Sequence, residues 1–297
     1  MRDALRLVLV GGLVGALCAP APAALLCKKR SGVLVVREAC KKKEALLDLS
    51  QLGVLGPQGD PGPAGPPEWE RPCPPDSVAV GTACIDKYEA SVWSVPADNT
   101  TLVAALRAGT ASREDLGAGG ATQIGAGCAT FFPETFPVTG NWTVPLYAAS
   151  VPGPPTSCVG WFQAAQACAL AGKRLATNEE WQRATAGTPD GAPCVVSAGS
   201  PGDTGTVGCV STWGAQDMVG NLNEWVAEWG EVAAGCGTWP SMFGNDFSCV
   251  GGTGANHLPA MLARGGGWSD GSLAGDFTVL SILPSDSGDG LGFRCAR

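Results

Sequence analysis

The sequence predicts an α+β domain that is rich in loops and stapled by disulfides. Three observations lead to this fold class. The chain of 297 residues contains 43 glycines and 23 prolines, which interrupt regular elements. Its 13 cysteines are typical of a disulfide framework. Convincing helical periods are few, whereas several stretches alternate apolar and polar residues as strands do.

The first residues are typical of a secretory signal peptide. Arg2 and Arg6 precede the apolar run LRLVLVGGLVGALCA, and Ala21-Pro22-Ala23 gives a small-residue cleavage pattern, so we expect residues 1–23 to be removed. The apolar run is too short for a comfortable membrane span, and no other stretch could cross a bilayer. The mature chain is therefore expected to be secreted, periplasmic or at the cell surface.

Cysteine and histidine content limits the chemistry. Without residues 1–23, twelve of the 13 cysteines remain, an even number that favours disulfides over metal–thiolate sites. The chain has one histidine, which excludes sites that need two or three imidazoles, such as those of zinc hydrolases.

Two segments precede the main domain. Residues 24–55 form a basic segment, with seven Lys/Arg against three Asp/Glu in residues 24–50. It is interpreted as a solvated leader, with contact to an anionic surface as the alternative. Its Cys27 and Cys40 could bond to each other or between chains. Residues 56–71 begin with GPQGDPGPAGPP, four Gly-X-Y triplets, which predict a stiff linker or, alternatively, a short collagen-like trimeric stalk.

Residues 72–297 form the main domain. From residue 51 onward there are ten Lys/Arg against twenty-three Asp/Glu, and this acidic balance excludes nucleic acid as a partner. A helix is expected in CVGWFQAAQACALAG, ending at Gly172. A second helix begins at Thr177, where Glu180 completes a capping box. The stretch SVAVGTACIDKYEASVW alternates as strands do.

Four stretches together carry a family resemblance. They are CIDKYEAS (84–91), GKRLATNEEWQRATAG (172–187), DMVGNLNEWVAEW (217–229) and RGGGWSDG…GFRCAR (264–297). In this order and spacing they closely resemble the formylglycine-generating enzyme, or sulfatase-modifying factor, family. The resemblance covers nearly all of residues 80–297. It implies a variant of the C-type lectin fold with little regular secondary structure.

The resemblance also implies a disulfide between Cys168 and Cys295, which would fix the last strand to the first helix of the motif. The other pairs are expected from short loop closure, and the last of them by elimination: Cys73–Cys84, Cys194–Cys209, Cys236–Cys249 and Cys128–Cys158.

The oxidase chemistry of the family is not expected here. The family uses two tail cysteines to bind copper(I), and the matching positions fall near Asp270 and Gly275. Copper(I) requires soft thiolates, so no catalytic residue is assigned and copper is not expected. A second family disulfide would need cysteines near Thr185 and Val279, and both are missing. A formylglycine-generating oxidoreductase that matures sulfatases is the alternative.

The loop DMVGNLNEW resembles a calcium site of the family. Asp217 and Glu224 would give side-chain oxygens, and Gly220 and Leu222 backbone carbonyls. We therefore expect calcium as a cofactor. A second family calcium site would need an asparagine near Val195 and is expected to be weak or absent.

Members of this fold without the catalytic pair include the variable proteins of diversity-generating retroelements, whose tails carry ligand-facing positions. The resemblance implies a non-catalytic module that binds an unidentified protein or glycan through tail residues Trp268, Ser269, Asp270, Ser272 and Asp276. Tryptophans 213, 225 and 229 are expected in the core.

Overall fold

The computed structural model describes residues 25–46, 72–126, 145–233, 235–250 and 258–297. The chain divides into two compact units, residues 1–65 and 66–297. The Gly-X-Y triplets and residues 1–23 lie outside the described residues, so the linker, stalk and signal-peptide predictions are not addressed by the structure.

The described part of the first unit, within the segment interpreted as a solvated leader, is a small antiparallel sheet. Its strands are β1 (Leu25–Lys29), β2 (Leu34–Arg37) and β3 (Glu44–Leu46), in the order β2-β1-β3. Cys27 is buried in the central strand and bonds to Cys40 within the chain. The sequence did not predict this sheet, because its strands are only three to five residues long and carry the basic side chains.

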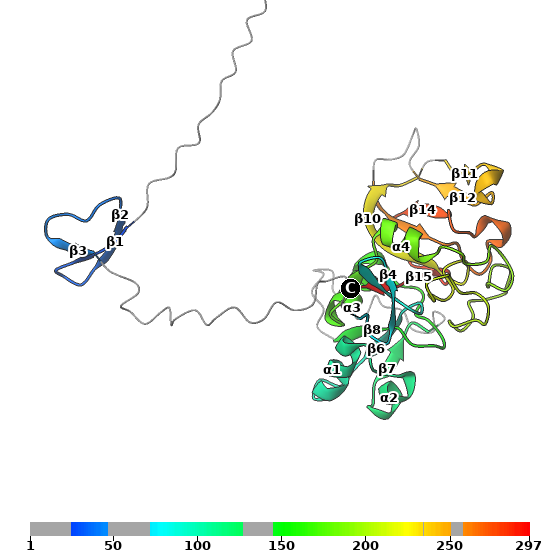
Figure 1. Ribbon diagram of the computed structural model, residues 1–297, viewed down its shortest axis with the longest axis horizontal. Helices are drawn as coiled ribbons and strands as arrows, with labels where there is room; N and C mark the ends of the chain where they lie inside the picture. The colour runs from blue at the N-terminus through cyan, green and yellow to red at the C-terminus, as the bar shows by residue number, and fades with distance from the viewer. Residues whose placement is uncertain (1–24, 47–71, 127–144, 234, 251–257) are drawn as a thin grey trace, which may run out of the picture. The chain divides into compact units, whose positions relative to one another are not determined.

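The second unit contains three sheets (Figure 1). A six-stranded mixed sheet has the order β11-β12-β14-β13-β10-β15, a four-stranded sheet the order β4-β5-β16-β9, and a three-stranded sheet the order β7-β6-β8. The strand bounds are β4 Ser77–Val80, β5 Ala83–Asp86, β6 Ser91–Ser94, β7 Thr122–Ile124, β8 Leu146–Ala149, β9 Arg174–Leu175, β10 Asn223–Glu231, β11 Gly237–Thr238, β12 Phe247–Cys249, β13 Pro259–Arg264, β14 Val279–Ile282, β15 Leu291–Phe293 and β16 Cys295–Ala296.

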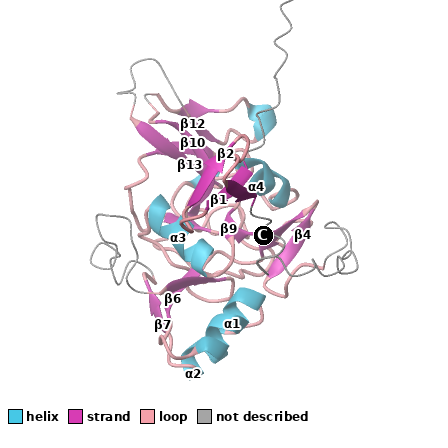
Figure 2. Ribbon diagram, turned by 90° about the vertical axis from the view of Figure 1, so that its left-hand side faces the viewer, coloured by secondary structure: helices cyan, strands magenta, loops and turns pink. Residues whose placement is uncertain are grey.

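Four α-helices and two short 3-10 helices are described in this unit. They are α1 Thr100–Ala108, α2 Arg113–Ala118, α3 Trp161–Leu170, α4 Asn178–Ala184, η4 Ser241–Phe243 and η5 Gly271–Leu273. Helices α1 and α2 lie beside β6 and β7, at the end of the unit away from β10 and β12 (Figure 2). None of the helices in the described ranges has the length and apolar composition of a bilayer span.

The two expected helices are present, and the first of them ends two residues before the expected Gly172. Helix α3 ends at Leu170, and Gly172 follows with a left-handed φ of +70° that glycine adopts without strain. Helix α4 begins after Thr177, whose hydroxyl accepts from the Glu180 amide while the Glu180 carboxylate accepts from the Thr177 amide. The capping box is therefore confirmed. Helices α1 and α2 were not predicted.

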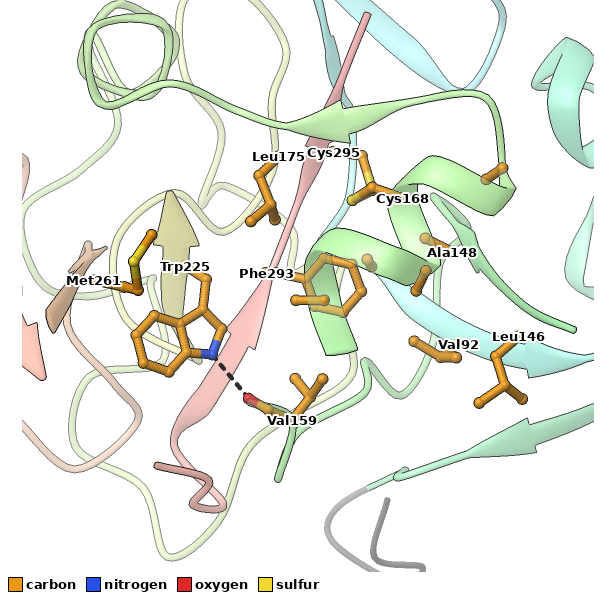
Figure 3. Close-up of a cluster of buried hydrophobic side chains, with 14 of the residues drawn as sticks. Val92, Leu146, Ala148, Val159, Cys168, Leu175, Trp225, Met261, Phe293 and Cys295 are labelled. Atoms are coloured by element: carbon orange, nitrogen blue, oxygen red, sulfur yellow. Dashed lines mark hydrogen bonds between the residues drawn. A yellow bond between two sulfur atoms is a disulfide. The ribbon is translucent and has the colours of Figure 1, made fainter. Parts of the chain in front are cut away.

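The largest buried hydrophobic cluster contains residues from all three sheets of the second unit (Figure 3). Trp225 of β10 and Phe293 of β15 meet helix α3 and strand β8 there. The Trp225 indole is fully buried and donates a 2.8 Å hydrogen bond to the Val159 carbonyl, so burying this polar nitrogen leaves no unpaired donor. The Cys168–Cys295 disulfide lies at the edge of the cluster and covalently joins α3 to β16.

Four further disulfides join described residues, and three of them match the expected local pairs. Those three are Cys73–Cys84, Cys194–Cys209 and Cys236–Cys249. Cys158 is disulfide-bonded, and its expected partner Cys128 lies outside the described residues. Several disulfides of this kind are typical of an extracellular or other oxidising compartment.

The Cys168–Cys295 bond should contribute more to stability than the local ones. It spans 127 residues, compared with 11 for Cys73–Cys84. Loop-closure entropy then predicts a loss of about 5 kcal/mol for Cys168→Ala with Cys295→Ala, against about 3 kcal/mol for the Cys73 and Cys84 pair. Denaturant unfolding of both double variants measures the difference. Equal losses would contradict the ranking by loop length.

Candidate functional site

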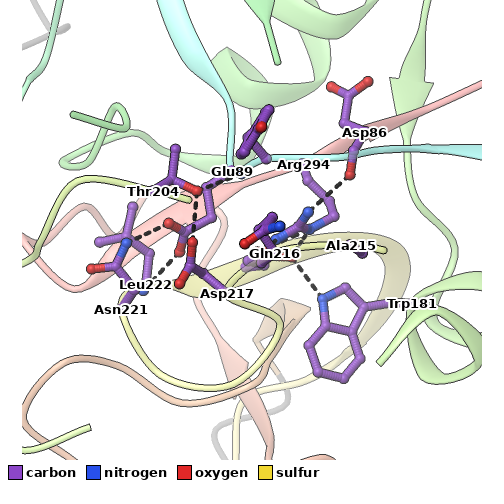
Figure 4. A network of polar contacts seen from close by, with 12 residues as sticks. Asp86, Glu89, Trp181, Thr204, Ala215, Gln216, Asp217, Asn221, Leu222 and Arg294 are labelled. Atoms are coloured by element: carbon purple, nitrogen blue, oxygen red, sulfur yellow. Dashed lines mark hydrogen bonds and ion pairs between the residues drawn. The ribbon is translucent and has the colours of Figure 1, made fainter. Parts of the chain in front are cut away.

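A buried ion pair joins two of the four stretches that carry the family resemblance, and it lies within a network of polar contacts (Figure 4). Arg294, between β15 and β16, is fully buried and pairs with Glu224 of β10, with Nη2–Oε1 at 2.6 Å and Nε–Oε2 at 2.8 Å. Trp181 of α4 donates to the same carboxylate at 2.7 Å. Burial alone would lower the pKa of Arg294, but the Glu224 charge raises it above the ordinary value. Arg294 is therefore charged.

A second buried carboxylate, Glu89, organises the loop before β10. Its oxygens accept from the Leu222 amide at 3.0 Å and from the Asn221 side-chain amide. Burial and then the charges of Asp217 and Glu224 raise the pKa of Glu89 well above its usual range. The loop that resembles a calcium site is thus held from inside by one backbone and one side-chain hydrogen bond to Glu89.

Of the four residues expected to bind calcium, Glu224 is already occupied by other contacts. Glu224 directs both oxygens at Arg294 and Trp181, so its charge is already compensated. Asp217 fits a cation better. It is buried, one oxygen accepts from Thr204 and Gly205, and Oδ1 has no hydrogen-bond partner. A buried, unpartnered carboxylate oxygen is the kind of atom that a metal or water completes.

The remaining two expected ligands belong to the tight turn itself. Gly220 has a φ of +74°, and a Cβ there would meet the Val195 carbonyl oxygen at 2.5 Å, so only glycine fits. Leu222 is buried and its amide is the one that contacts Glu89. Within the described ranges, no group of three or more histidine, cysteine, aspartate or glutamate side chains is arranged to hold a metal ion.

The five tail residues expected to face a ligand lie in four different environments. Ser269 and Ser272 are exposed. Asp270 accepts a 2.7 Å hydrogen bond from the Gly267 amide and so shapes the turn before η5. Trp268 is half-buried, and its indole nitrogen is buried without a partner. Asp276 lines a pocket, to which the other four do not contribute.

That pocket was not predicted from the sequence. It has a volume of about 100 Å³ and is lined by Asp190, Met242, Phe243, Gly244, Asp246, Asp276 and Phe277. It lies where the loop before Cys194, the stretch closed by Cys236–Cys249 and the tail come together. The available sequence signal was the disulfide-bracketed stretch CGTWPSMFGNDFSC, which combines aromatic residues with an aspartate.

Three carboxylates share this pocket, and none of them forms an ion pair with another described residue. Burial, together with the charges of Asp246 and Asp190, raises the pKa of Asp276 to about 6, against the lowering effect of a 2.8 Å hydrogen bond from Thr185. Burial also raises the pKa of Asp246 and of Asp190. None of the ion pairs found among the described residues includes any of the three.

Asp246 is the most buried of the three, with 1% of its surface exposed. Its Oδ2 accepts a 2.7 Å hydrogen bond from the Phe277 amide, and its Oδ1 is buried without a partner. A Cβ built on Gly244 would lie 2.6 Å from Asp246 Oδ1 and 2.8 Å from Asp190 Oδ2. Oxygens of two different carboxylates therefore converge beside Gly244.

Aromatic side chains line the rim of the pocket. The Phe243 and Phe277 rings stand edge to face with centroids 5.1 Å apart, and Trp239 lies next to Phe243 at 6.4 Å. All three are more than a third exposed, and Met242 is 79% exposed. Large apolar side chains left in solvent around a polar centre are typical of a binding site.

The expectation that three tryptophans belong to the core is correct only for Trp225. Trp213 is 45% exposed and Trp229 is 53% exposed. Trp229 lies on β10 beyond the irregularity in its pairing with β13, and it contacts the exposed ring of Phe162. The four-residue spacing of Trp225 and Trp229 in the sequence did not reveal this break.

The positions matched to the oxidase cysteines have other roles in the structure. Asp270 shapes the turn described above, and Gly275 is pressed against Asp246, whose Oδ1 lies 2.2 Å from where a Gly275 Cβ would stand. Thr185, matched to the missing second disulfide, donates to Asp276. Cys295 is bonded to Cys168.

No family model and no curated protein sequence matches the chain. Several solved structures are similar in part. The Major Tropism Determinant M1 variant aligns with 92% of this chain and 71% of its own at 15% identity and a TM-score of 0.44. PvdO from Pseudomonas aeruginosa aligns with 72% of this chain and 80% of its own at 20% identity and a TM-score of 0.39.

The Major Tropism Determinant I1 variant aligns with 46% of this chain at 24% identity and a TM-score of 0.35. The aligned part spans 37% of the I1 variant and 52% of the U1 variant. The link to the formylglycine-generating family accordingly rests on the four sequence motifs.

The Glu224–Arg294 pair should be essential to the folded state. Glu224→Gln leaves the buried guanidinium without its counter-charge, which predicts a loss of about 3–5 kcal/mol in the free energy of unfolding. Glu179→Gln is the matched control, because its ion pair with Arg183 is more than half exposed on both sides and should contribute less than about 1 kcal/mol. Denaturant unfolding compares the two, and similar small losses would contradict a central role for the pair.

Proposed function

We propose that the chain is an exported, non-catalytic binding module of the C-type-lectin-like, sulfatase-modifying-factor type. Its contact surface is the tail between Trp268 and Asp286 together with the pocket that Asp276 lines. The observation that supports this most strongly is the pocket itself, because three carboxylates that form no ion pair with the described residues lie beside exposed aromatic rings there. The ligand is a protein or a glycan.

The surrounding structure supports presentation of this surface rather than oxygen chemistry. Ser269 and Ser272 stand exposed on the turn that leads to the pocket. The cysteine that ends the tail, Cys295, is engaged in a disulfide, so it offers no thiolate to copper(I). The collagen-like segment 56–71 is proposed as the linker or trimeric stalk that carries the domain.

Binding of a macromolecule at the tail is tested by blocking it with a bulky charge. The mature chain is applied to glycan and peptide arrays, and its ligands are titrated against Ser272→Arg. We expect at least a tenfold loss of affinity, because Ser272 is exposed on η5 next to the pocket-lining segment. Ala104→Arg on the exposed side of α1 is the matched control and should bind normally.

Two outcomes would contradict the binding module. One is equal binding by the Ser272 and Ala104 variants, which would move the contact surface elsewhere. The other is conversion of cysteine to formylglycine in a C-x-P-x-R peptide by the mature chain, read by mass spectrometry. That result would establish the oxidoreductase alternative.

We also propose that the loop 217–224 binds one calcium ion through Asp217 and the carbonyls of Gly220 and Leu222. Glu224 stays with Arg294 in this proposal. A bound calcium ion would coordinate the Asp217 oxygen that has no hydrogen-bond partner.

The calcium proposal predicts different behaviour for two acidic residues of one loop. Ligand binding to the folded state raises the melting temperature, so calcium should raise the Tm of the mature chain. Asp217→Asn should abolish this calcium-dependent shift, whereas Glu224→Gln should lower the Tm yet retain the shift. Differential scanning fluorimetry with calcium and with chelator measures both. A shift that persists in Asp217→Asn would place the ion elsewhere.

A further inference from the structure

The pocket at Asp276 has the chemistry of a site for one kind of cation. We propose that it binds a primary alkylammonium group, such as the end of a lysine side chain. This inference rests on the proposed binding function and specifies the group that the ligand presents to the pocket. Four features support it: uncompensated charge, an unpartnered acceptor, an aromatic wall and a small volume.

The charge in the pocket calls for a positive partner. The charge of Arg264 lowers the pKa of Asp246 and of Asp276, but the guanidinium itself is directed elsewhere. Its guanidinium stacks over the Trp181 ring at 4.7 Å and donates to Asn178 and to the backbone carbonyl of Asp276. Burial lowers the pKa of Arg264 to about 10, so it is protonated at neutral pH, yet it forms no ion pair with the three carboxylates within the described ranges. A ligand cation would compensate them directly.

The unpartnered oxygen selects a cation that donates hydrogen bonds. Asp246 Oδ1 is buried, and leaving such an acceptor unpaired costs about 1–3 kcal/mol. An ammonium with N–H groups can donate to it and to the nearby Asp190 oxygen at the same time, since both lie beside Gly244. A quaternary ammonium has no N–H group and would leave the acceptor unpaired.

The walls select an alkyl chain behind the charged group. Phe243, Phe277 and Met242 have no side-chain oxygen, so the side chains of three of the seven lining residues cannot serve as ligands to a hard metal ion. Aromatic faces do stabilise ammonium groups within ~6 Å of the ring centroid and pack against methylenes. A volume of about 100 Å³ accommodates the ammonium and a few methylenes, since a water molecule occupies roughly 30 Å³.

The protonation of Asp276 determines how the affinity for the ammonium ligand changes with pH. Asp276, with a pKa of about 6, faces Asp246, Asp190 and Arg264, and its Oδ1 accepts from Thr185. Below pH 6 Asp276 is protonated and its attraction for a cation is lost, whereas the ligand amine, with a pKa of about 10.4, stays charged. Affinity should therefore be higher at pH 7.5 than at pH 5.

The direct test uses a defined probe and the mature chain. Nα-acetyl-lysine-N-methylamide is titrated by ligand-observed NMR, with the norleucine derivative as the uncharged isostere. We expect millimolar binding of the lysine probe, no detectable binding of norleucine, and at least threefold weaker binding at pH 5 than at pH 7.5. Cadaverine distinguishes a free amine from a lysine in a peptide: equal affinity shows that the ammonium alone is recognised, and weaker affinity shows that the peptide backbone adds to it.

Matched variants assign the binding to this pocket. Asp246→Asn keeps an acceptor for the Phe277 amide but removes the charge, and we expect at least a tenfold loss of affinity for the lysine probe. Asp190→Asn, at an exposed position where folding is not at risk, should weaken binding in the same direction. Asp289→Asn, exposed on the tail outside the pocket, is the control and should bind as the unchanged protein does.

Three results would overturn the ammonium site. They are equal binding of the lysine and norleucine probes, unchanged affinity in both pocket variants, and displacement of the lysine probe by calcium at a lower concentration than by cadaverine. None of these bears on macromolecular binding at Ser272, because that experiment reads array ligands and a different side chain. Loss of the ammonium site and loss of the binding module are therefore separate outcomes.

Discussion

The buried pair of Arg294 and Glu224 is the interaction on which the rest of the domain depends. Arg294 also donates to the backbone carbonyls of Asp86 and Gln216, so one side chain joins β5, the loop before β10 and β10 itself to the end of the chain. A guanidinium offers five donors in a rigid plane, and here each contact comes from a different segment. Because both charges are buried, displacement of any one segment exposes an uncompensated charge to a low-dielectric interior.

A comparison of the acidic residues separates structural from functional ones. Asp76 and Asp86 are buried, but the Lys173 ammonium lies 2.5 Å from Asp76 and 2.6 Å from Asp86. Arg297 forms a second ion pair with Asp76. Glu224 is paired in the same way. Asp190, Asp246 and Asp276 differ, because each is partly or wholly removed from water and none has a cation within ion-pair distance among the described residues.

The sequence predicted the parts of the fold that depend on local signals. The capping box of Thr177 and the helix that ends before Gly172 follow from neighbouring residues, and so do the short disulfide loops. Family motifs supplied the long-range contact between Cys168 and Cys295. Helices α1 and α2 were missed because each buries only one or two side chains, which gives a weak apolar period.

The pocket could not be predicted, because its carboxylates come from three loops that lie far apart in sequence. Asp276 was selected as a tail residue, but Asp190 and Asp246 meet it only through tertiary structure. The decisive property of Asp246, an oxygen without a partner, is a result of packing. Composition alone showed only an excess of acid, which on most surfaces is simply solvated.

The stability of the loops around the pocket and the charge inside the pocket are linked. Burying carboxylates that repel one another costs free energy, and the loops that carry them would separate if they were free to move. Two disulfides limit the freedom of individual loops, since Cys236–Cys249 encloses Asp246 and Cys194–Cys209 begins four residues after Asp190. Hydrogen bonds join the segments to one another: the Phe277 amide holds Asp246 against the tail, and Thr185 holds Asp276 against the end of α4. These contacts oppose the repulsion before any ligand arrives, and a cation that enters relieves it without having to order the loops.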